Sequence, residues 1–146
     1  MRFRLIATAT GQILGDFQSV YEPLQKTNPR ATELASHVSV YWSPDSRHLV
    51  LDEAFDGETS SGLVVIVVTP TAAKKLSLPL ERLASFLSKK YHCVTVEFHR
   101  WLGKRMFYAT IHGETDHQDA DNEYESVSLV IKVEKDDTIT TFNPDE

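Results

Sequence analysis

Cysteine is almost absent from this chain: Cys93 is the only one among 146 residues. No disulfide can therefore form within the chain, which is typical of proteins from reducing compartments. Long apolar runs are also lacking. The basic start from Met1 to Arg4 leads into a segment that Thr8, Thr10 and Gly11 interrupt, so neither a signal peptide nor a membrane-spanning helix is indicated. We therefore expect a cytoplasmic protein with no membrane partner.

The common sequence motifs of catalysis and nucleotide binding are lacking as well. There is no G-x-S-x-G, H-E-x-x-H, P-loop or G-x-G-x-x-G pattern. His92 and Cys93 are adjacent, and neighbouring side chains of a strand point to opposite faces, so they do not form a catalytic pair. Cys93 is expected to be a small buried hydrophobic residue. Glu97 and His99 are expected on the same face of the strand. Such a pair more often stabilises a surface histidine than catalyses an acid–base reaction.

Basic residues are few compared with acidic ones. The chain has 15 Lys and Arg and 21 Asp and Glu, which gives a net charge of −6. The whole excess lies in one predicted loop, whose six acids have no Lys or Arg among them. A nucleic-acid-binding protein needs a basic surface, so that class is disfavoured. An acidic loop suits a basic protein partner through electrostatic steering. We therefore predict partner contacts from Glu114, Asp116, Asp119, Asp121, Glu123 and Glu125.

The same loop holds the densest set of potential metal ligands, including His112 and His117. An EF-hand calcium loop requires glycine at its sixth position, where Tyr124 stands if counting starts at Asp119. A solvated acidic loop is the more common outcome for such a segment. The sequence therefore predicts no metal and no cofactor.

Apolar periodicity predicts an α+β fold built on a mostly antiparallel sheet of about seven strands. Alternation indicates strands over 3–9, 13–20, 38–55 (a hairpin), 94–112 (a second hairpin), 126–134 and 138–142. The unbroken apolar run from Leu63 to Thr69 predicts a strand covered on both faces. One main helix is expected over 79–91, with a short one from Asn28-Pro29 through Ser36.

The two hairpins carry the residues of most interest. In the first, Val38, Val40 and Trp42 are expected on a buried face, and Asp45 is expected to stabilise the turn. In the second, one face is apolar and the other is polar. The polar face should present three residues that are typical interface anchors if they are open to solvent. These predicted partner-binding residues are His99, Trp101 and Tyr108.

Trp42 to Arg47 reads W-S-P-D-S-R. This segment resembles the hairpin of a β-propeller blade, in which W-S-P-D-G-R joins two apolar strands. Ser46 replaces the usual glycine, at a corner that often needs a positive φ and where serine costs about 1 kcal/mol. The resemblance implies local structure only, because propellers carry many unrelated functions.

A shift of 56 residues aligns the two hairpins without a gap and places Gly57-Glu58-Thr59 on Gly113-Glu114-Thr115. The match predicts an internal duplication of 38–69 and 94–134 within a single domain, 1–146. Two copies cannot close a propeller of about four to eight blades. A sheet protein of two similar units is therefore expected.

These observations favour a non-enzymatic protein-binding module, such as an immunity or inhibitor protein that neutralises a basic protein partner. Two alternatives stay open. One is a small hydrolase that uses His99 or His112 with neighbouring carboxylates, and the other is an accessory or sensor domain derived from a propeller. The sequence leaves the identity of the partner and homo-oligomer formation undecided.

Overall fold

The computed structural model describes residues 2–18, 35–55, 62–91, 93–115 and 123–145. This part of the chain forms ten strands in three antiparallel sheets and one short helix. The N-terminal hairpin comprises β1 (Arg2–Ile6) and β2 (Ile13–Gln18). The first sheet comprises β3 (Ala35–Trp42), β4 (His48–Phe55), β5 (Gly62–Val68) and β6 (Ala73–Leu76). The second sheet comprises β7 (Cys93–Trp101), β8 (Met106–Glu114), β9 (Tyr124–Val133) and β10 (Ile139–Phe142).

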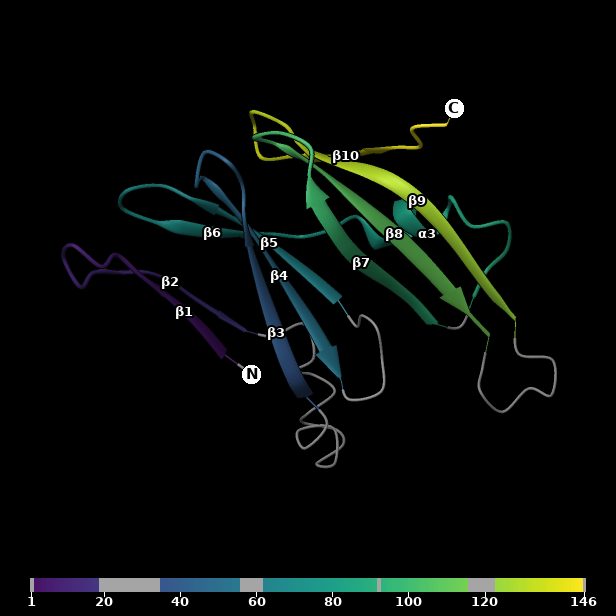
Figure 1. Ribbon diagram of the computed structural model, residues 1–146, viewed down its shortest axis with the longest axis horizontal. Coiled ribbons are helices and arrows are strands. Elements are labelled where there is room, and N and C mark those ends of the chain that lie inside the picture. Colours follow the sequence, from purple (N-terminus) through teal and green to yellow (C-terminus); the bar gives the residue numbers. More distant parts are fainter. Residues whose placement is uncertain (1, 19–34, 56–61, 92, 116–122, 146) are drawn as a thin grey trace.

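Both larger sheets are meanders, because the strands follow one another in space as they do in the chain. Figure 1 shows the three sheets side by side, with the first sheet between the N-terminal hairpin and the second sheet. A large core that includes Val50, Val65 and Phe107 joins the two larger sheets. A smaller core that includes Phe17, Leu51 and Ile66 joins the first sheet to the hairpin.

Strand β5 is buried on both faces, as its apolar run predicts. Val65 contributes to the large core and its neighbours Val64 and Ile66 contribute to the small one. The position of β5 inside the sheet order agrees with this burial. The antiparallel pairing, the N-terminal strands and the short final strand β10 at a sheet edge are also confirmed.

The predicted α+β class is wrong in its helical part, and the structure is mainly β with ten strands instead of about seven. The helix expected over 79–91 is reduced to α3 (Leu80–Ala84). The Ser85 hydroxyl donates to the Arg82 carbonyl at 2.5 Å, and the Ser88 N–H donates to the Glu125 carboxylate at 2.8 Å. These bonds replace the helical ladder, although Leu83 and Leu87 still reach the large core as the apolar stripe predicts.

The predicted burial of Val40 and Trp42 is also wrong, since their exposed fractions are 52% and 45%. The N-terminal hairpin makes most of its contacts with the first sheet at β6, so among the described side chains of the edge strand β3 only Val38 is partly buried against the small core. The helix predicted from Asn28-Pro29 lies outside the described residues, except that Ala35 and Ser36 belong to strand β3.

The two predicted repeat units do form hairpins, and their matching faces point toward the preceding layer. Leu51 faces the N-terminal hairpin, and Ala109 faces the first sheet. The ladders pair Val40 with Leu51 and Phe98 with Ala109, so equivalent positions are 58 residues apart rather than 56. Gly57-Glu58-Thr59 lies outside the described residues, and the duplication stays a prediction.

The turn between β3 and β4 is held by side chains, as predicted for Asp45. The carboxylate of Asp45 accepts hydrogen bonds from the Ser43 hydroxyl at 2.7 Å and the Arg47 N–H at 3.2 Å. Ser46 has a φ of 58°. This is the left-handed conformation that glycine adopts without steric cost.

Replacing Ser46 by glycine should therefore raise the free energy of unfolding by about 1 kcal/mol. Urea denaturation measures the change. Ser39→Gly is the matched control, because Ser39 lies inside strand β3, where glycine should instead lower stability by about 0.5–1 kcal/mol. Destabilisation by both substitutions would show that the turn does not require this conformation in solution.

Candidate functional site on the second sheet

The candidate site is the outer face of the second sheet, defined as the face turned away from the first sheet. In the described part of the chain, the elements that pack against this sheet do so on its other face: Leu83 and Leu87 join the large core, and a Cβ at Gly113 would touch Leu87 and Tyr91. The helix therefore does not lie over the polar face. Among the polar side chains of the outer face are Thr95, Glu97, His99, Tyr108, Thr110, His112, Ser126 and Ser128.

Hydrogen bonds link these side chains into two rows that cross the strands. In one row, His112 Nε2 lies 2.9 Å from the Glu97 carboxylate and His112 Nδ1 lies 2.7 Å from the Ser126 hydroxyl. In the other, His99 Nε2 lies 2.5 Å from the hydroxyl of Thr110, which is 3.5 Å from that of Ser128. Both rows use residues of β7, β8 and β9.

A β-bulge in β7 changes which residues share this face. Phe98 pairs with Ala109 and Arg100 pairs with Tyr108, so His99 is an extra residue between them. Beyond a bulge the alternation of faces is reversed. Trp101 therefore pairs with Phe107 on the core side.

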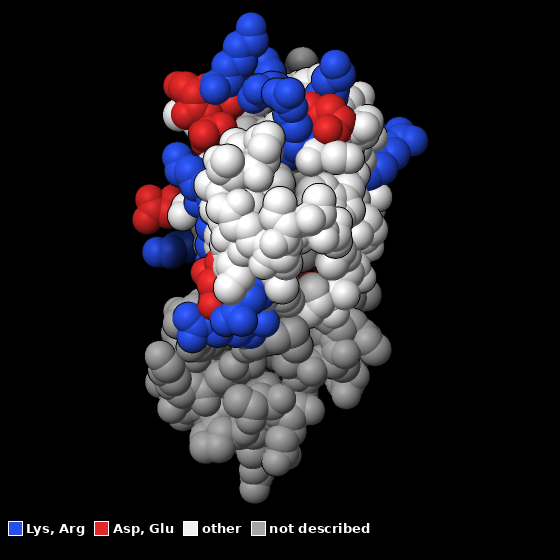
Figure 2. Space-filling model, turned by 90° about the vertical axis from the view of Figure 1, so that its left-hand side faces the viewer, with Lys and Arg blue, Asp and Glu red and all other residues white. Residues whose placement is uncertain are grey.

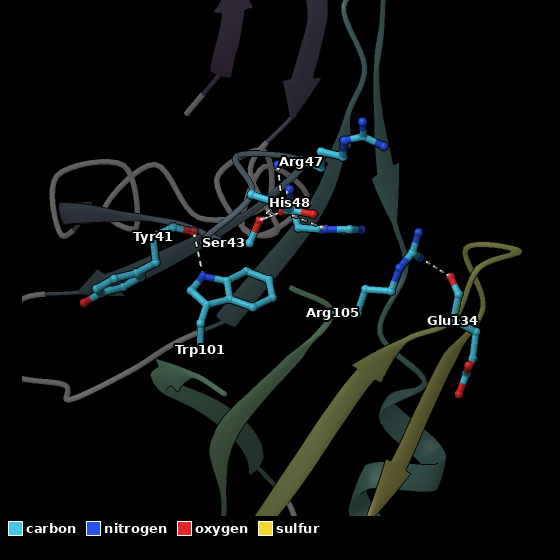
Figure 3. A network of polar contacts seen from close by, with 8 residues as sticks. Tyr41, Ser43, Arg47, His48, Trp101, Arg105 and Glu134 are labelled. Atoms are coloured by element: carbon cyan, nitrogen blue, oxygen red, sulfur yellow. Dashed lines mark hydrogen bonds and ion pairs between the residues drawn. The ribbon is translucent and has the colours of Figure 1, made fainter. Parts of the chain in front are cut away.

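The prediction that Trp101 shares a face with His99 and Tyr108 is thus wrong. Its ring packs edge-on against that of Phe107, with centroids 5.3 Å apart. Its Nε1–H donates to the carbonyl of Tyr41 at 3.2 Å (Figure 3), so Trp101 connects the second sheet to the first. It is part of the packing between the sheets.

His99 and Tyr108 lie together on the outer face, with ring centroids 5.9 Å apart. Two further aromatic residues that the sequence did not single out extend this surface. Phe142 pairs with Val130, which pairs with Tyr108, and Tyr124 lies two residues before Ser126 on β9. Their exposed fractions are 45% for Phe142 and 69% for Tyr124. Neither stood out in the sequence, because a single aromatic residue in a short strand is equally common in a core.

Three of the six predicted partner-binding acids, Asp116, Asp119 and Asp121, lie outside the described residues. Glu114 ends strand β8 opposite Tyr124. Glu123 forms an ion pair with Lys89. The structure therefore places Glu114 at the rim of the outer face and gives Glu123 a partner within the chain.

Glu125 anchors the segment that follows α3. Its carboxylate accepts hydrogen bonds from the Tyr91 hydroxyl at 2.7 Å, the Ser88 hydroxyl at 2.7 Å and the Ser88 N–H at 2.8 Å. These bonds, that of Tyr91 first, lower the pKa of Glu125, and the same contact raises the pKa of Tyr91. Glu125 thus has a structural function in addition to the predicted contact with a partner.

Cys93 is exposed, so its predicted burial is wrong: it begins β7, at the end of the sheet. Within the described ranges, no group of three His, Cys, Asp or Glu side chains is arranged to hold a metal ion. No described helix is both long and apolar enough to span a membrane.

Replacing Glu125 by glutamine should lower the melting temperature at neutral pH, because an amide is a weaker acceptor than a carboxylate. The folded-state pKa of Glu125 is depressed, so its stabilisation is present above the unfolded-state value and is lost as the pH falls through the folded-state value. The difference between variant and wild type should therefore shrink below about pH 4. Melting curves from pH 3 to pH 7 test this.

Glu81→Gln is the matched control, since Glu81 is an exposed acid of α3. It should leave the melting temperature within about 1 °C of the wild type, as expected for an exposed side chain outside such a network. If Glu125→Gln behaves like this control at every pH, the anchoring contacts contribute nothing to stability.

Comparison with protein-family models, with curated proteins and with solved structures found no match to this chain. Its function is therefore inferred from its own residues.

Proposed function

We propose that this protein is a non-enzymatic protein-binding module that engages its partner through the outer face of the second sheet. The observation that carries the proposal is the set of aromatic rings on this face: His99, Tyr108, Tyr124 and Phe142 stand on paired strands without an element over them in the described part of the chain. Aromatic residues dominate binding hot spots, and a paired sheet holds them with little loss of entropy on binding.

Charge on this surface favours a basic partner at one end. Glu114 ends β8, and the acids at 116, 119 and 121 follow it in the sequence, outside the described residues, whereas Arg100 and Lys132 stand near the opposite ends of these strands. Opposite charges at the two ends would orient a partner, and they would repel proteins whose charges are arranged differently. An immunity or inhibitor protein that neutralises a basic protein is the kind of module that this surface suits.

The test begins with capture of the partner on immobilised wild-type protein, identification by mass spectrometry, and binding of the purified partner. His99→Ala with Tyr108→Ala should weaken binding by about thirtyfold, the scale of one hot spot of roughly 2 kcal/mol. The matched control is Val40→Ala with Trp42→Ala, which removes exposed apolar side chains from the first sheet. Binding that is lost in the control pair and kept in the outer-face pair would contradict the proposal.

A second candidate, a hydrolase, is favoured by the row from Glu97 to Ser126. Because the Glu97 carboxylate can only accept, a neutral imidazole at His112 would donate from Nε2, and its Nδ1 would then accept the hydroxyl proton of Ser126. This order of hydroxyl, imidazole and carboxylate is that of an activated nucleophile. In acyl transfer, Ser126 Oγ would attack the acyl carbon, His112 would take the proton and pass it to the leaving group, and water would then release the acyl group.

Two features favour the binding module over the hydrolase. The side chains of His112 and Glu97 are 32% and 31% exposed on an open sheet, which does not exclude water from a reaction. The row from His99 through Thr110 to Ser128 repeats the cross-strand pattern without a carboxylate. Such repetition is expected of a hydrogen-bonded sheet surface.

A fluorophosphonate probe separates the two candidates, because an activated serine displaces its fluoride and forms an Oγ–P bond. We expect the wild-type protein to remain unlabelled at probe concentrations that label a serine hydrolase fully. Ser128→Ala serves as the control for Ser126→Ala, since both serines lie on the same face of β9. Labelling that disappears in Ser126→Ala and His112→Gln but persists in Ser128→Ala would replace the binding proposal with the hydrolase.

A further inference from the structure

A pocket of about 290 Å³ lies at the end of the molecule where the turns of the two larger sheets meet. The β3–β4 turn contributes Arg47 and His48 at its end, the turn before β8 contributes Arg105, and the β9–β10 turn contributes Asp137. The pocket thus combines two guanidinium groups, an imidazole and a carboxylate from three separate turns.

His48 is the most unusual of these residues. Its side chain is only 2% exposed, and within the described part of the protein neither ring nitrogen has a hydrogen bond of good geometry, the backbone of Lys104 making only a weak contact with the ring. The Asp45 carboxylate is 4.0 Å from Nδ1, beyond hydrogen-bond distance. Burial lowers the pKa of His48 more than Asp45 raises it, so the ring is neutral at pH 7 and keeps one N–H donor. A buried polar group without a partner is costly, and such groups often mark a binding site.

Positive charge gathers around this pocket although the whole chain is acidic. Lys104 lies in the same turn as Arg105 and Lys135 lies in the β9–β10 turn with Asp137, while Lys132 is near the end of β9 and Lys74 of β6 lies 3.9 Å from the Asp137 carboxylate. Figure 2 shows Lys and Arg side chains grouped at this upper end of the molecule, with acidic side chains among them. Arg105 is positioned by a hydrogen bond from Nη1 to the carbonyl of Glu134 at 3.0 Å (Figure 3).

We propose that this pocket binds a phosphate group that carries at least one P–OH. Arg47 and Arg105 would pair with the charged oxygens, since guanidinium groups match phosphate geometry. His48, whose ring nitrogens are buried in this structure, would donate its N–H to a third oxygen once its ring turns toward the pocket. Asp137 would accept the proton of the P–OH group.

Asp137 gives the site its selectivity. A carboxylate beside a bound anion repels any oxyanion that has no proton to donate, such as sulfate at neutral pH. Hydrogen phosphate always carries such a proton at this pH. Lys74 Nζ lies 3.9 Å from the Asp137 carboxylate and forms an ion pair with it at the edge of the pocket. The pocket should therefore bind phosphate and reject sulfate.

The volume of the pocket bears on the source of the phosphate. About 290 Å³ is roughly ten times the ~30 Å³ that a water molecule occupies, which leaves room for a small substituent beside a phosphate group. A phosphate monoester carries a P–OH only below its second pKa of about 6, so it shares with inorganic phosphate the chemistry that the four side chains recognise only when the two are compared at about pH 5. Phenyl phosphate, compared with inorganic phosphate, distinguishes the two sources.

The test is titration of the purified full chain with inorganic phosphate, phenyl phosphate and sulfate at constant ionic strength, followed by calorimetry and by melting temperature. Phosphate should raise the melting temperature of the wild type, whereas sulfate should not. Arg47→Gln should weaken phosphate binding by at least about tenfold. Lys75→Gln removes an equal charge from an exposed position outside the pocket and should change binding by less than about twofold.

Two further variants keep the test decisive if an arginine substitution disturbs folding. Asp137 has a φ of 66°, which asparagine tolerates, so Asp137→Asn should keep the turn and let sulfate bind as well as phosphate. His48→Phe should melt no lower than the wild type but lose the rise caused by phosphate. Equal effects of phosphate and sulfate on the wild type, or equal binding by Arg47→Gln and Lys75→Gln, would overturn the proposal.

Discussion

Apolar packing between the two larger sheets is the interaction on which the rest of this structure depends. Phe107, Ile111 and Ile131 are fully buried there, opposite Val50 and Val65 of the first sheet. Burial at about 25 cal/mol per Å² of apolar surface makes this core the largest source of stability. Because side chains alternate along a strand, fixing one face in this core also fixes which residues form the outer face. The polar rows and the aromatic rings of the candidate site are therefore consequences of the core.

Much of the fold could be predicted because it follows from local rules. The alternation of apolar and polar residues predicted the hairpins, and the unbroken apolar run predicted that β5 lies inside a sheet. The turn sequence indicated the positive φ that Ser46 adopts. The helix was predicted too long because the Ser88 N–H bonds to Glu125, which is 37 residues away in the chain. Strand β6 was missed because Ala73–Leu76 is short and follows a proline. In the case of the helix, a contact between distant segments decided the outcome.

The candidate site was predictable only in part, for the same reason. His99 and Tyr108 fell on the correct face, but one bulge moved Trp101 to the other side, and a single extra residue leaves no mark in the apolar pattern. The link from Glu97 through His112 to Ser126 requires the register of three strands. His48 begins β4 in a position where a solvent-exposed histidine is usual. Its burial arises from turns of both sheets, which the sequence does not bring together.

The order in which the layers are stacked determines where a further sheet could be added to such a chain. Each meander presents its matching face to the layer before it, so a further meander could be added after β10 without disturbing either existing core. The hydrogen-bonded rows on the outer face act as a cap, like the polar terminal repeats of solenoid proteins. Side chains that are satisfied among themselves gain little from another sheet. Lengthening the stack would therefore require apolar substitutions on this face, and the aromatic rings there are already the first step of such a change.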